Sequence, residues 1–347
     1  IDDAKAMAED YCELANFPVP EVWKRSKAFT FSYVDLSVNK GIATITINRP
    51  EAMNALNETV VGQLGSAIDK ANADDSVNTI VLDGAGKAFV AGADVKFFVD
   101  KIRADSFPDI YDFTADGHKV LNKLESSSKT TIALTTGLSL GGGLELALSC
   151  DYRIGTRKTQ FRFPETNIGI FPGLGGTQRP ARIAGLPAAR WAVLAGNFMD
   201  ARTAADLGLV TDLVDVTEVD STISSLDAKG KPAEKYPATP VNPESKIAKF
   251  ANSFYSDENM DTLLNGGCPD GFDPEDKLVS RQLKSLSRTA PIALRMASDL
   301  IDAAGKTELM TGLGQELDNL EAIFSTNDAL EGLSALIEGR KPTYQNS

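Results

Sequence analysis

The stretch GLSLGGGLELALSCDYRIG, residues 137–155, runs from apolar residues into three consecutive glycines and then to a lone glutamate. Glycine costs a helix roughly 1 kcal/mol per residue relative to alanine, and a carboxylate facing an apolar core is also costly. A strand, a tight glycine turn and a helix account for both features. The glycines let the backbone approach a ligand closely, and the helix dipole favours Glu145 in the first turn. The free N–H groups of that turn can hold an anion or a developing oxyanion.

Two further segments have the same physical character. KAFVAGADVK, residues 87–96, follows a strand and leads into a helix, so it can supply a second N–H to the same carbonyl oxygen. RFPETNIGIFPGLGGTQR, residues 162–179, carries Glu165 after a strand. Taken singly, the first motif also fits a plain glycine turn with a capping glutamate. Glu165 alone also fits a surface carboxylate, the commonest place for a glutamate.

Hydrophobic periodicity predicts the elements around these motifs. Alternating residues on either side of Asn39-Lys40-Gly41 predict a β-hairpin, and the segment 87–102 reads as a loop that runs into a helix. Other strands are predicted at 77–84, 130–137, 152–156 and 159–165, and helices from Asn57 onward and at 186–195, 289–304, 308–324 and 327–339. The alternation of strands and helices in the first half predicts an α/β fold, with a parallel or mixed sheet covered by helices.

Composition along the chain predicts four regions. Residues 1–29 read as an N-terminal helical extension or linker, and 30–220 as the core. Residues 221–285 are rich in Lys, Pro and turn residues, so we expect an irregular insertion on the surface, where insertions are tolerated. Residues 286–347 form a C-terminal helical region.

Charge and cysteine usage restrict the partners and the compartment. The 347 residues include 35 Lys and Arg against 48 Asp and Glu, a formal net charge of −13. Such an acidic surface repels nucleic acid and anionic membranes, so we expect neither as a partner. No apolar run is long enough to predict a membrane-spanning helix. The three cysteines, Cys12, Cys150 and Cys268, fit no CxxC or zinc spacing and indicate reduced thiols in the cytoplasm.

The sequence also predicts that no metal or nucleotide cofactor is used. The single histidine, His118, rules out a His-rich metal site, and its polar neighbours predict a surface position. No Lys-Ser or Lys-Thr follows the glycines at 141–143, which excludes a phosphate loop. GLGG at 173–176 lacks the GxGxxG spacing of a dinucleotide fingerprint.

Five motifs in order resemble the crotonase, or enoyl-CoA hydratase/isomerase, superfamily. They are NRPEAMNAL (48–56), AFVAGADVK (88–96), the opening stretch, FPETNIGIFPGLGGTQRPARIAG (163–185) and AADLGLVTDLV (204–214). The similarity covers roughly 30–216 and 285–345. It implies a crotonase fold, in which repeated ββα units form two roughly perpendicular sheets, with a C-terminal helical region that forms trimers.

The resemblance also implies roles for individual residues. The N–H groups of Ala93 and Gly142 would form an oxyanion hole for a thioester oxygen. Glu145 and Glu165 match the two glutamates of the true hydratases, the first activating water and the second protonating Cα. Further substrate contacts are implied at Ala55, Ala91, Gly92, Asp94, Val95, Lys96, Gly141, Gly173, Phe324 and Lys341. Arg162 stands where the family usually has a small residue, so it either reaches the acyl pocket or points to solvent.

The expected activity is the hydration of short-chain trans-2-enoyl-CoA, such as crotonyl-CoA, or the reverse dehydration. Aromatic residues in 95–113 favour a short acyl pocket, and CoA is part of the substrate, so no separate cofactor is needed. The alternatives on the same fold are an enoyl-CoA isomerase and a 3-hydroxyacyl-CoA thioester hydrolase, although Gly173 stands where the hydrolases place an acidic residue. An RNA-binding homologue is disfavoured by the net charge of −13.

The resemblance extends to partners. Phe324 and Lys341 match positions that in the family reach the CoA of a neighbouring subunit, which implies a homotrimer or a dimer of trimers. The N-terminal lead-in is similar to the hydratase half of an archaeal fusion protein. A fused or associated 3-hydroxyacyl-CoA dehydrogenase is therefore an expected partner.

Overall fold

The computed structural model describes residues 32–347, of which Val34–Ser347 form one compact unit. The predicted extension at 1–29 lies outside the described residues. The predicted hairpin is confirmed: β1 (Val34–Asn39) and β2 (Ile42–Ile47) pair antiparallel. Lys40 and Gly41 make the turn with φ of 49° and 84°. A left-handed conformation of this kind is what a tight hairpin turn requires.

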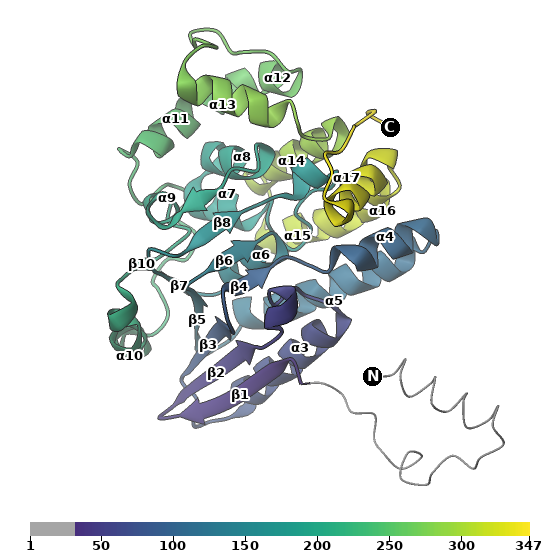
Figure 1. Cartoon of the computed structure of the whole chain (residues 1–347). Helices are drawn as coiled ribbons and strands as arrows, with labels where there is room; N and C mark the ends of the chain where they lie inside the picture. Colours follow the sequence, from purple (N-terminus) through teal and green to yellow (C-terminus); the bar gives the residue numbers. More distant parts are fainter. Residues whose placement is uncertain (1–31) are drawn as a thin grey trace, which may run out of the picture. The chain divides into compact units, whose positions relative to one another are not determined.

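The chain then winds through three successive turns, and each turn gives one strand to each of two sheets. The pairs of strands are β3 (Thr79–Gly84) and β4 (Ala88–Ala91), β5 (Thr130–Thr135) and β6 (Leu138–Leu140), and β7 (Tyr152–Gly155) and β8 (Gln160–Arg162). The six-stranded sheet has the order β1-β2-β3-β5-β7-β10, in which β10 is Asp212–Leu213. The four-stranded sheet has the order β4-β6-β8-β9, in which β9 is Met199–Asp200. Neighbouring turns pair in parallel in both sheets, which confirms the repeated two-strand units (Figure 1).

Strand β4 corrects the prediction of a loop over the first part of 87–102. It has only four residues, and Ala88, Phe89 and Val90 are all buried. A strand that is buried on both faces shows no alternation of apolar and polar residues. The small residues that follow it then made the segment look like a loop.

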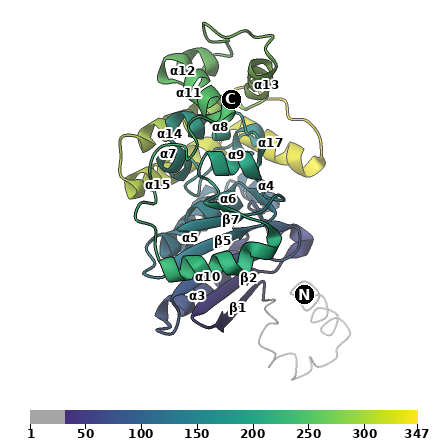
Figure 2. The same ribbon diagram turned by 90° about the vertical axis from the view of Figure 1, so that its left-hand side faces the viewer.

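Helices cover both faces of the six-stranded sheet. On one face, α3 (Glu58–Ala73) packs against β1, β2 and α5 (Phe107–Glu125). The Asn57 side chain caps α3 by accepting a hydrogen bond from the Val60 N–H at 2.9 Å. On the other face, α10 (Val219–Lys229) places Ile223 and Leu226 against apolar residues of β3, β5 and β7. Figure 2 shows α10 lying across that face.

The other elements that precede α10 lie between residues 50 and 218. They are η1 (Pro50–Ala52), α4 (Val95–Arg103), α6 (Gly142–Leu148), η2 (Glu165–Ile168), α7 (Arg179–Ala184), α8 (Leu186–Leu194), β9 (Met199–Asp200), α9 (Ala201–Asp206), β10 (Asp212–Leu213) and η3 (Val216–Glu218). The helix predicted at 186–195 is therefore confirmed as α8.

The expectation that 221–285 is an irregular insertion was wrong. The segment contains most of α10 and all of α11 (Lys246–Phe254), α12 (Asp257–Leu264) and α13 (Lys277–Leu286). Phe254 and Tyr255 are completely buried. The Lys and Pro content suggested a solvated excursion, but composition does not reveal which core residues a segment will meet.

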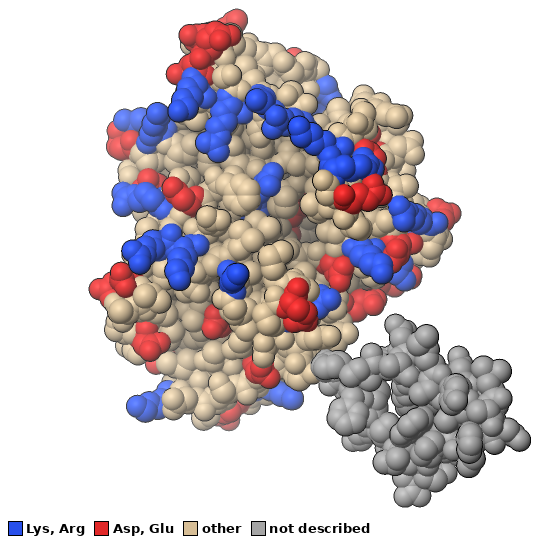
Figure 3. All heavy atoms as spheres, viewed as in Figure 1, with Lys and Arg blue, Asp and Glu red and all other residues tan. Residues whose placement is uncertain are grey.

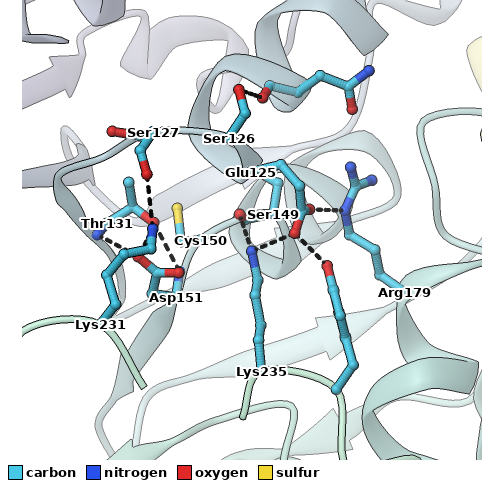
Figure 4. A network of polar contacts seen from close by, with 12 residues as sticks. Glu125, Ser126, Ser127, Thr131, Ser149, Cys150, Asp151, Arg179, Lys231 and Lys235 are labelled. Atoms are coloured by element: carbon cyan, nitrogen blue, oxygen red, sulfur yellow. Dashed lines mark hydrogen bonds and ion pairs between the residues drawn. The ribbon is translucent and has the colours of Figure 1, made fainter. Parts of the chain in front are cut away.

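Ion pairs also hold the segment 221–285 against the core (Figure 4). Lys235 Nζ lies 2.7 Å from the carboxylate of Glu125, which Arg179 approaches from the other side at 2.9 Å. Lys231 Nζ lies 2.9 Å from the buried carboxylate of Asp151. The chain around 231–235 is therefore part of the packed structure.

The C-terminal region consists of α14 (Pro291–Ala304), α15 (Leu309–Asp318), α16 (Leu320–Phe324) and α17 (Asn327–Glu338). The single helix predicted over 308–324 is interrupted at Asn319. Helix α17 packs against α4 and η2, the elements that follow β4 and β8, and Figure 1 shows it beside α4. No helix between residues 32 and 347 is long and apolar enough to span a membrane.

Candidate active site

A cavity of about 390 Å³ opens where β4 and β6 end, between η2, α4 and the C-terminal helices. The predicted site residues that line it are Ala91, Gly92, Ala93, Val95, Gly141, Gly142, Glu145, Glu165, Gly173 and Phe324. The structure therefore brings both predicted glutamates and both predicted oxyanion donors into one cavity.

Four predicted contact residues lie outside the lining of this cavity. Ala55 is half-buried, and its carbonyl oxygen accepts a hydrogen bond from Arg49 at 3.2 Å. Asp94 forms an ion pair with Arg49 at 3.4 Å. Lys96 and Lys341 are exposed. These residues can meet only parts of a substrate that extend beyond the cavity.

Strand register places the two predicted oxyanion donors side by side. Ala91 of β4 pairs with Leu140 of β6. Ala93 lies two residues after Ala91, and Gly142 lies two residues after Leu140. Neither of these two N–H groups donates a hydrogen bond to any group in residues 32–347. Gly142 is the first residue of α6, whose opening N–H groups have no partner within the helix. Two free donors at one sheet edge suit a developing oxyanion.

Close packing explains the run of glycines in the opening stretch. Gly141 has a φ of 44°, and a Cβ on this residue would run into the carboxylate of Glu165. A Cβ on Gly143 would run into the backbone of Val90 in β4. The glycines therefore allow α6 to lie directly on β4 while Glu165 lies against the turn.

The carboxylate of Glu145 is held by backbone donors. Its Oε1 atom accepts hydrogen bonds from the N–H groups of Leu174 and Gly176, both at 2.7 Å. The side chain is 2% exposed. Because both donors use Oε1, the Oε2 atom is left for other contacts within the cavity.

Glu165 has a different environment. It lies in η2 and is 7% exposed, and its buried Oε2 atom has no hydrogen-bond partner among the described residues. An unpartnered buried polar atom is costly. In a cavity, such an atom is available to a substrate or a water molecule.

Burial and mutual repulsion set the protonation of the two glutamates. Burial raises the pKa of Glu145 to about 7, although the hydrogen bonds from Leu174 and Gly176 oppose the increase. Burial and the nearby charge of Glu145 raise the pKa of Glu165 well above its ordinary value. Near neutral pH one carboxyl group can therefore carry a proton while the other accepts one.

Sequence reasoning missed another buried carboxylate close to this site, that of Glu316 in α15. It is completely buried and accepts hydrogen bonds from the N–H groups of Gly175 and Thr177, at 2.6 and 3.1 Å. A signal was present, because Glu316 occupies an inward position of the helical stripe that also contains Leu313 and Leu320. A charged residue at such a position is unusual without a partner.

The structure also corrects the surface position predicted for His118 and decides between the two alternatives for Arg162. His118 is 3% exposed rather than on the surface, and its Nε2 atom lies 2.7 Å from the carbonyl oxygen of Gly173. Arg162 lines the cavity and donates hydrogen bonds to the carbonyl oxygen of Gly196 and the side chain of Asn167, at 2.8 and 2.9 Å. The solvent-pointing alternative for Arg162 is thereby excluded.

Aromatic side chains close one part of the cavity. Phe98 stacks on Phe324 with ring centroids 5.1 Å apart and meets Phe113 edge-on at 5.8 Å. Phe324 is 4% exposed. The structure places Phe324 in the cavity of its own chain, whereas the resemblance implied that it reaches a neighbouring subunit.

Comparison with known proteins agrees with this geometry. The chain is 30% identical over 315 residues to a probable enoyl-CoA hydratase of Mycobacterium tuberculosis, covering 91% of this chain and 98% of the relative. It is 30% identical over 301 residues to the short-chain-enoyl-CoA hydratase of Clostridium acetobutylicum, covering 86% and 92% of the two chains. It is 28% identical over 315 residues to the crotonyl-CoA hydratase of Syntrophomonas wolfei, covering 90% and 98%.

The fold has close counterparts among solved structures. A carnitinyl-CoA dehydratase from Mycobacterium thermoresistibile superposes with a TM-score of 0.76 at 22% identity, covering 90% of this chain and 92% of the other. An enoyl-CoA hydratase from Rhodobacter sphaeroides has the same TM-score and coverage at 24% identity. At this level of identity the two structures show the fold alone. The family model described as enoyl-CoA hydratase/isomerase matches residues 42–347, and the chain belongs to the enoyl-CoA hydratase/isomerase family.

Proposed function

We propose that this protein adds water to short-chain trans-2-enoyl-CoA thioesters, giving 3-hydroxyacyl-CoA, and catalyses the reverse dehydration. The observation that carries the proposal is the arrangement of one cavity. It holds two buried carboxyl groups, Glu145 and Glu165, together with two N–H groups, of Ala93 and Gly142, that have no partner among the described residues. Hydration of a conjugated thioester needs both kinds of group.

In this mechanism the thioester oxygen lies between the N–H groups of Ala93 and Gly142. Glu145 removes a proton from water as the water oxygen bonds to Cβ. The electron pair of the double bond moves onto the thioester oxygen, where the two donors stabilise it. Glu165 then gives its proton to Cα, which restores the carbonyl group. Losing one such donor typically costs about 3 kcal/mol of transition-state stabilisation.

The electrostatics support this division of roles. Glu165 keeps its proton to higher pH, because burial and the Glu145 charge both oppose its ionisation. Glu145 ionises near neutrality, because two N–H groups stabilise its charged form. A base is most effective when its pKa lies near the working pH. The groups share one site, so their ionisations are coupled.

The shape of the cavity supports a short acyl group. The stacked rings of Phe98 and Phe324, with Phe113 beside them, close one part of the cavity, and an acyl group that lies toward them has room only for a short chain. The names of two relatives, short-chain-enoyl-CoA hydratase and crotonyl-CoA hydratase, point in the same direction.

Exposed basic side chains are the candidates for binding the phosphates of CoA, because the net charge of the chain is −13. Figure 3 shows Lys and Arg side chains in a row over the upper part of the molecule, where α13 lies. On this helix Lys277, Arg281 and Lys284 are exposed. Lys96 and Lys341 are exposed as well and stay candidates for contact with the CoA phosphates, with Lys341 contributed by a neighbour in a trimer or a dimer of trimers. Sedimentation of the full chain tests that assembly.

The decisive test is to follow the enoyl-thioester absorbance with C4, C6, C8 and branched trans-2-enoyl-CoA substrates. We expect the C4 substrate to give the highest kcat/KM and a 3-hydroxyacyl-CoA product. Double-bond migration without hydration would show an isomerase, and release of free CoA would show a hydrolase. Either result would overturn the proposal.

A further inference from the structure

The loop formed by residues 173–177 lies between two buried carboxylates. The N–H groups of Leu174 and Gly176 both bind Glu145 at 2.7 Å. The N–H groups of Gly175 and Thr177 bind Glu316 at 2.6 and 3.1 Å. Successive N–H groups of one short loop therefore go alternately to the candidate base and to a residue of α15.

Glu316 holds this loop firmly. The Thr177 hydroxyl donates a further hydrogen bond to its Oε1 atom at 2.5 Å. The same hydroxyl oxygen accepts a hydrogen bond from Gln178 Nε2 at 2.7 Å, which fixes its orientation. Glu316 is absent from the lining of the cavity. It can therefore act on the reaction only through the loop.

The carbonyl side of the loop is fixed as well. Burial and the charge of Arg179 lower the pKa of His118 to about 4, so the ring is neutral and its Nε2–H donates to the Gly173 oxygen at 2.7 Å. Arg179 donates to the Leu174 oxygen at 2.8 Å and is itself held by Glu125 at 2.9 Å (Figure 4). The loop has little freedom to move while Glu316 is in place.

We propose that Glu316 is a positioning residue for Glu145. By binding the N–H groups of Gly175 and Thr177, it orients the N–H groups of Leu174 and Gly176 toward the Glu145 carboxylate. Helix α15 thereby contributes to the active site through the loop, although Glu316 does not line the cavity. The inference rests on the proposed function for its kinetic consequences, whereas the loop geometry can be tested without any substrate.

The proposal has a signature in the pH profile that a purely structural residue lacks. Burial raises the pKa of Glu145, and the hydrogen bonds from Leu174 and Gly176 oppose this increase. Burial and the charge of Glu145 raise the pKa of Glu316 to about 8, and the His118 ring, 3.8 Å from Glu316 Oε2, is neutral. The Glu316 carboxyl group therefore stays largely protonated while Glu145 ionises. When the Glu316 substitution displaces the two loop N–H groups, the pKa of Glu145 rises, and the limb of the pH–rate profile that reports Glu145 moves to higher pH.

The test compares Glu316→Gln with a matched control, Asp328→Asn. Asp328 in α17 is also a buried carboxylate that accepts two backbone hydrogen bonds, from Gln345 at 2.7 Å and Asn346 at 2.9 Å, but it does not bind the loop. Glutamine has only one side-chain oxygen. In Glu316→Gln one of the two loop N–H groups therefore faces the amide NH₂ group and loses its hydrogen bond. We expect kcat to fall about 10- to 100-fold, as a displacement of about 1 Å can cause. KM should change little, and the limb of the pH–rate profile that reports Glu145 should shift to higher pH.

Two Thr177 variants guard against failure of the first variant to fold. Thr177→Val removes the hydroxyl that binds Glu316 and should lower kcat, whereas Thr177→Ser keeps the hydroxyl and should restore it. Asp328→Asn should keep the kcat and the pH profile of the wild type even if its melting temperature falls. The proposal is overturned if Glu316→Gln and Thr177→Val keep the wild-type kcat and pH profile, or lose activity only in proportion to unfolded protein.

Amide hydrogen exchange separates this inference from the proposed function. In the substrate-free protein, Glu316→Gln should speed exchange not only at residues 175 and 177 but also at 174 and 176, whose partner is Glu145. If the wild type hydrates no enoyl-CoA, the proposed function fails while the exchange measurement still tests the loop. Unchanged exchange at 174 and 176 would refute the positioning role.

Discussion

Replacing the two cavity glutamates by glutamine, singly and together, tests the proposed chemistry most directly. In Glu145→Gln the amide oxygen can keep both hydrogen bonds, because Leu174 and Gly176 donate to the single atom Oε1. The fold and the loop should therefore survive. What is lost is the base, and the usual contribution of a positioned base is about 10²- to 10⁴-fold in kcat, or about 3 to 5 kcal/mol.

Glu165→Gln should have an effect of similar size for a different reason. The Oε2 atom of Glu165 has no partner among the described residues, so the substitution breaks no hydrogen bond of that atom and removes only the proton donor. The double variant should be little slower than the slower single variant, because groups that act on one water and one substrate are strongly non-additive.

The assay is the decrease in enoyl-thioester absorbance with crotonyl-CoA, with kcat and KM determined separately for all four proteins. KM should stay within a few-fold of the wild-type value, since the N–H groups of Ala93 and Gly142 still hold the thioester oxygen. Multiplicative losses in the double variant would show that the two carboxylates act independently. Two single variants with near wild-type rates would refute the assignment of this site.

Three further predictions concern pH, chain length and folding. The folded-state pKa of Glu145 is raised from 4.5 to about 7, so its contribution to stability is present at low pH and is lost as pH rises through that range. Relative to wild type, Glu145→Gln should therefore gain up to about 3 kcal/mol between about pH 5 and pH 8.5, measured as the difference in melting temperature; no gain would contradict this burial effect. Phe98→Ala should raise the ratio of kcat/KM for C8 over C4 enoyl-CoA by emptying the space beside Phe324, and an unchanged ratio would place the acyl chain elsewhere. Replacing 222–270 by a Gly/Ser linker should prevent folding, because Phe254 and Tyr255 are completely buried; a cooperative melting transition in the truncated chain would contradict this.

The elements that the sequence predicts well are those with a strong local signal. The hairpin at 34–47 has alternating residues and a turn that tolerates positive φ, and the opening glycines mark the turn before α6. The pair Glu145 and Glu165 could be assigned because each follows a strand within a recognisable motif. Their convergence on one cavity follows from the parallel pairing of β4, β6 and β8.

The features that the sequence did not predict depend on partners far away in the chain. Glu316 binds a loop about 140 residues earlier, and Lys235 pairs with Glu125, so neither contact has a local pattern. The polar neighbours of His118 suggested exposure, although the helix that carries it turns this side chain toward Gly173. Such long-range polar contacts decide whether a charged residue is solvated or buried.

The alternation of N–H groups along 173–177 also restricts how this loop can change length during evolution. Inserting or deleting one residue between Leu174 and Thr177 would exchange the two sides, so that groups now facing Glu145 would face α15 instead. A change of two residues keeps the order of sides but moves the contacts along the loop. The spacing of this segment is therefore set by parity as well as by size.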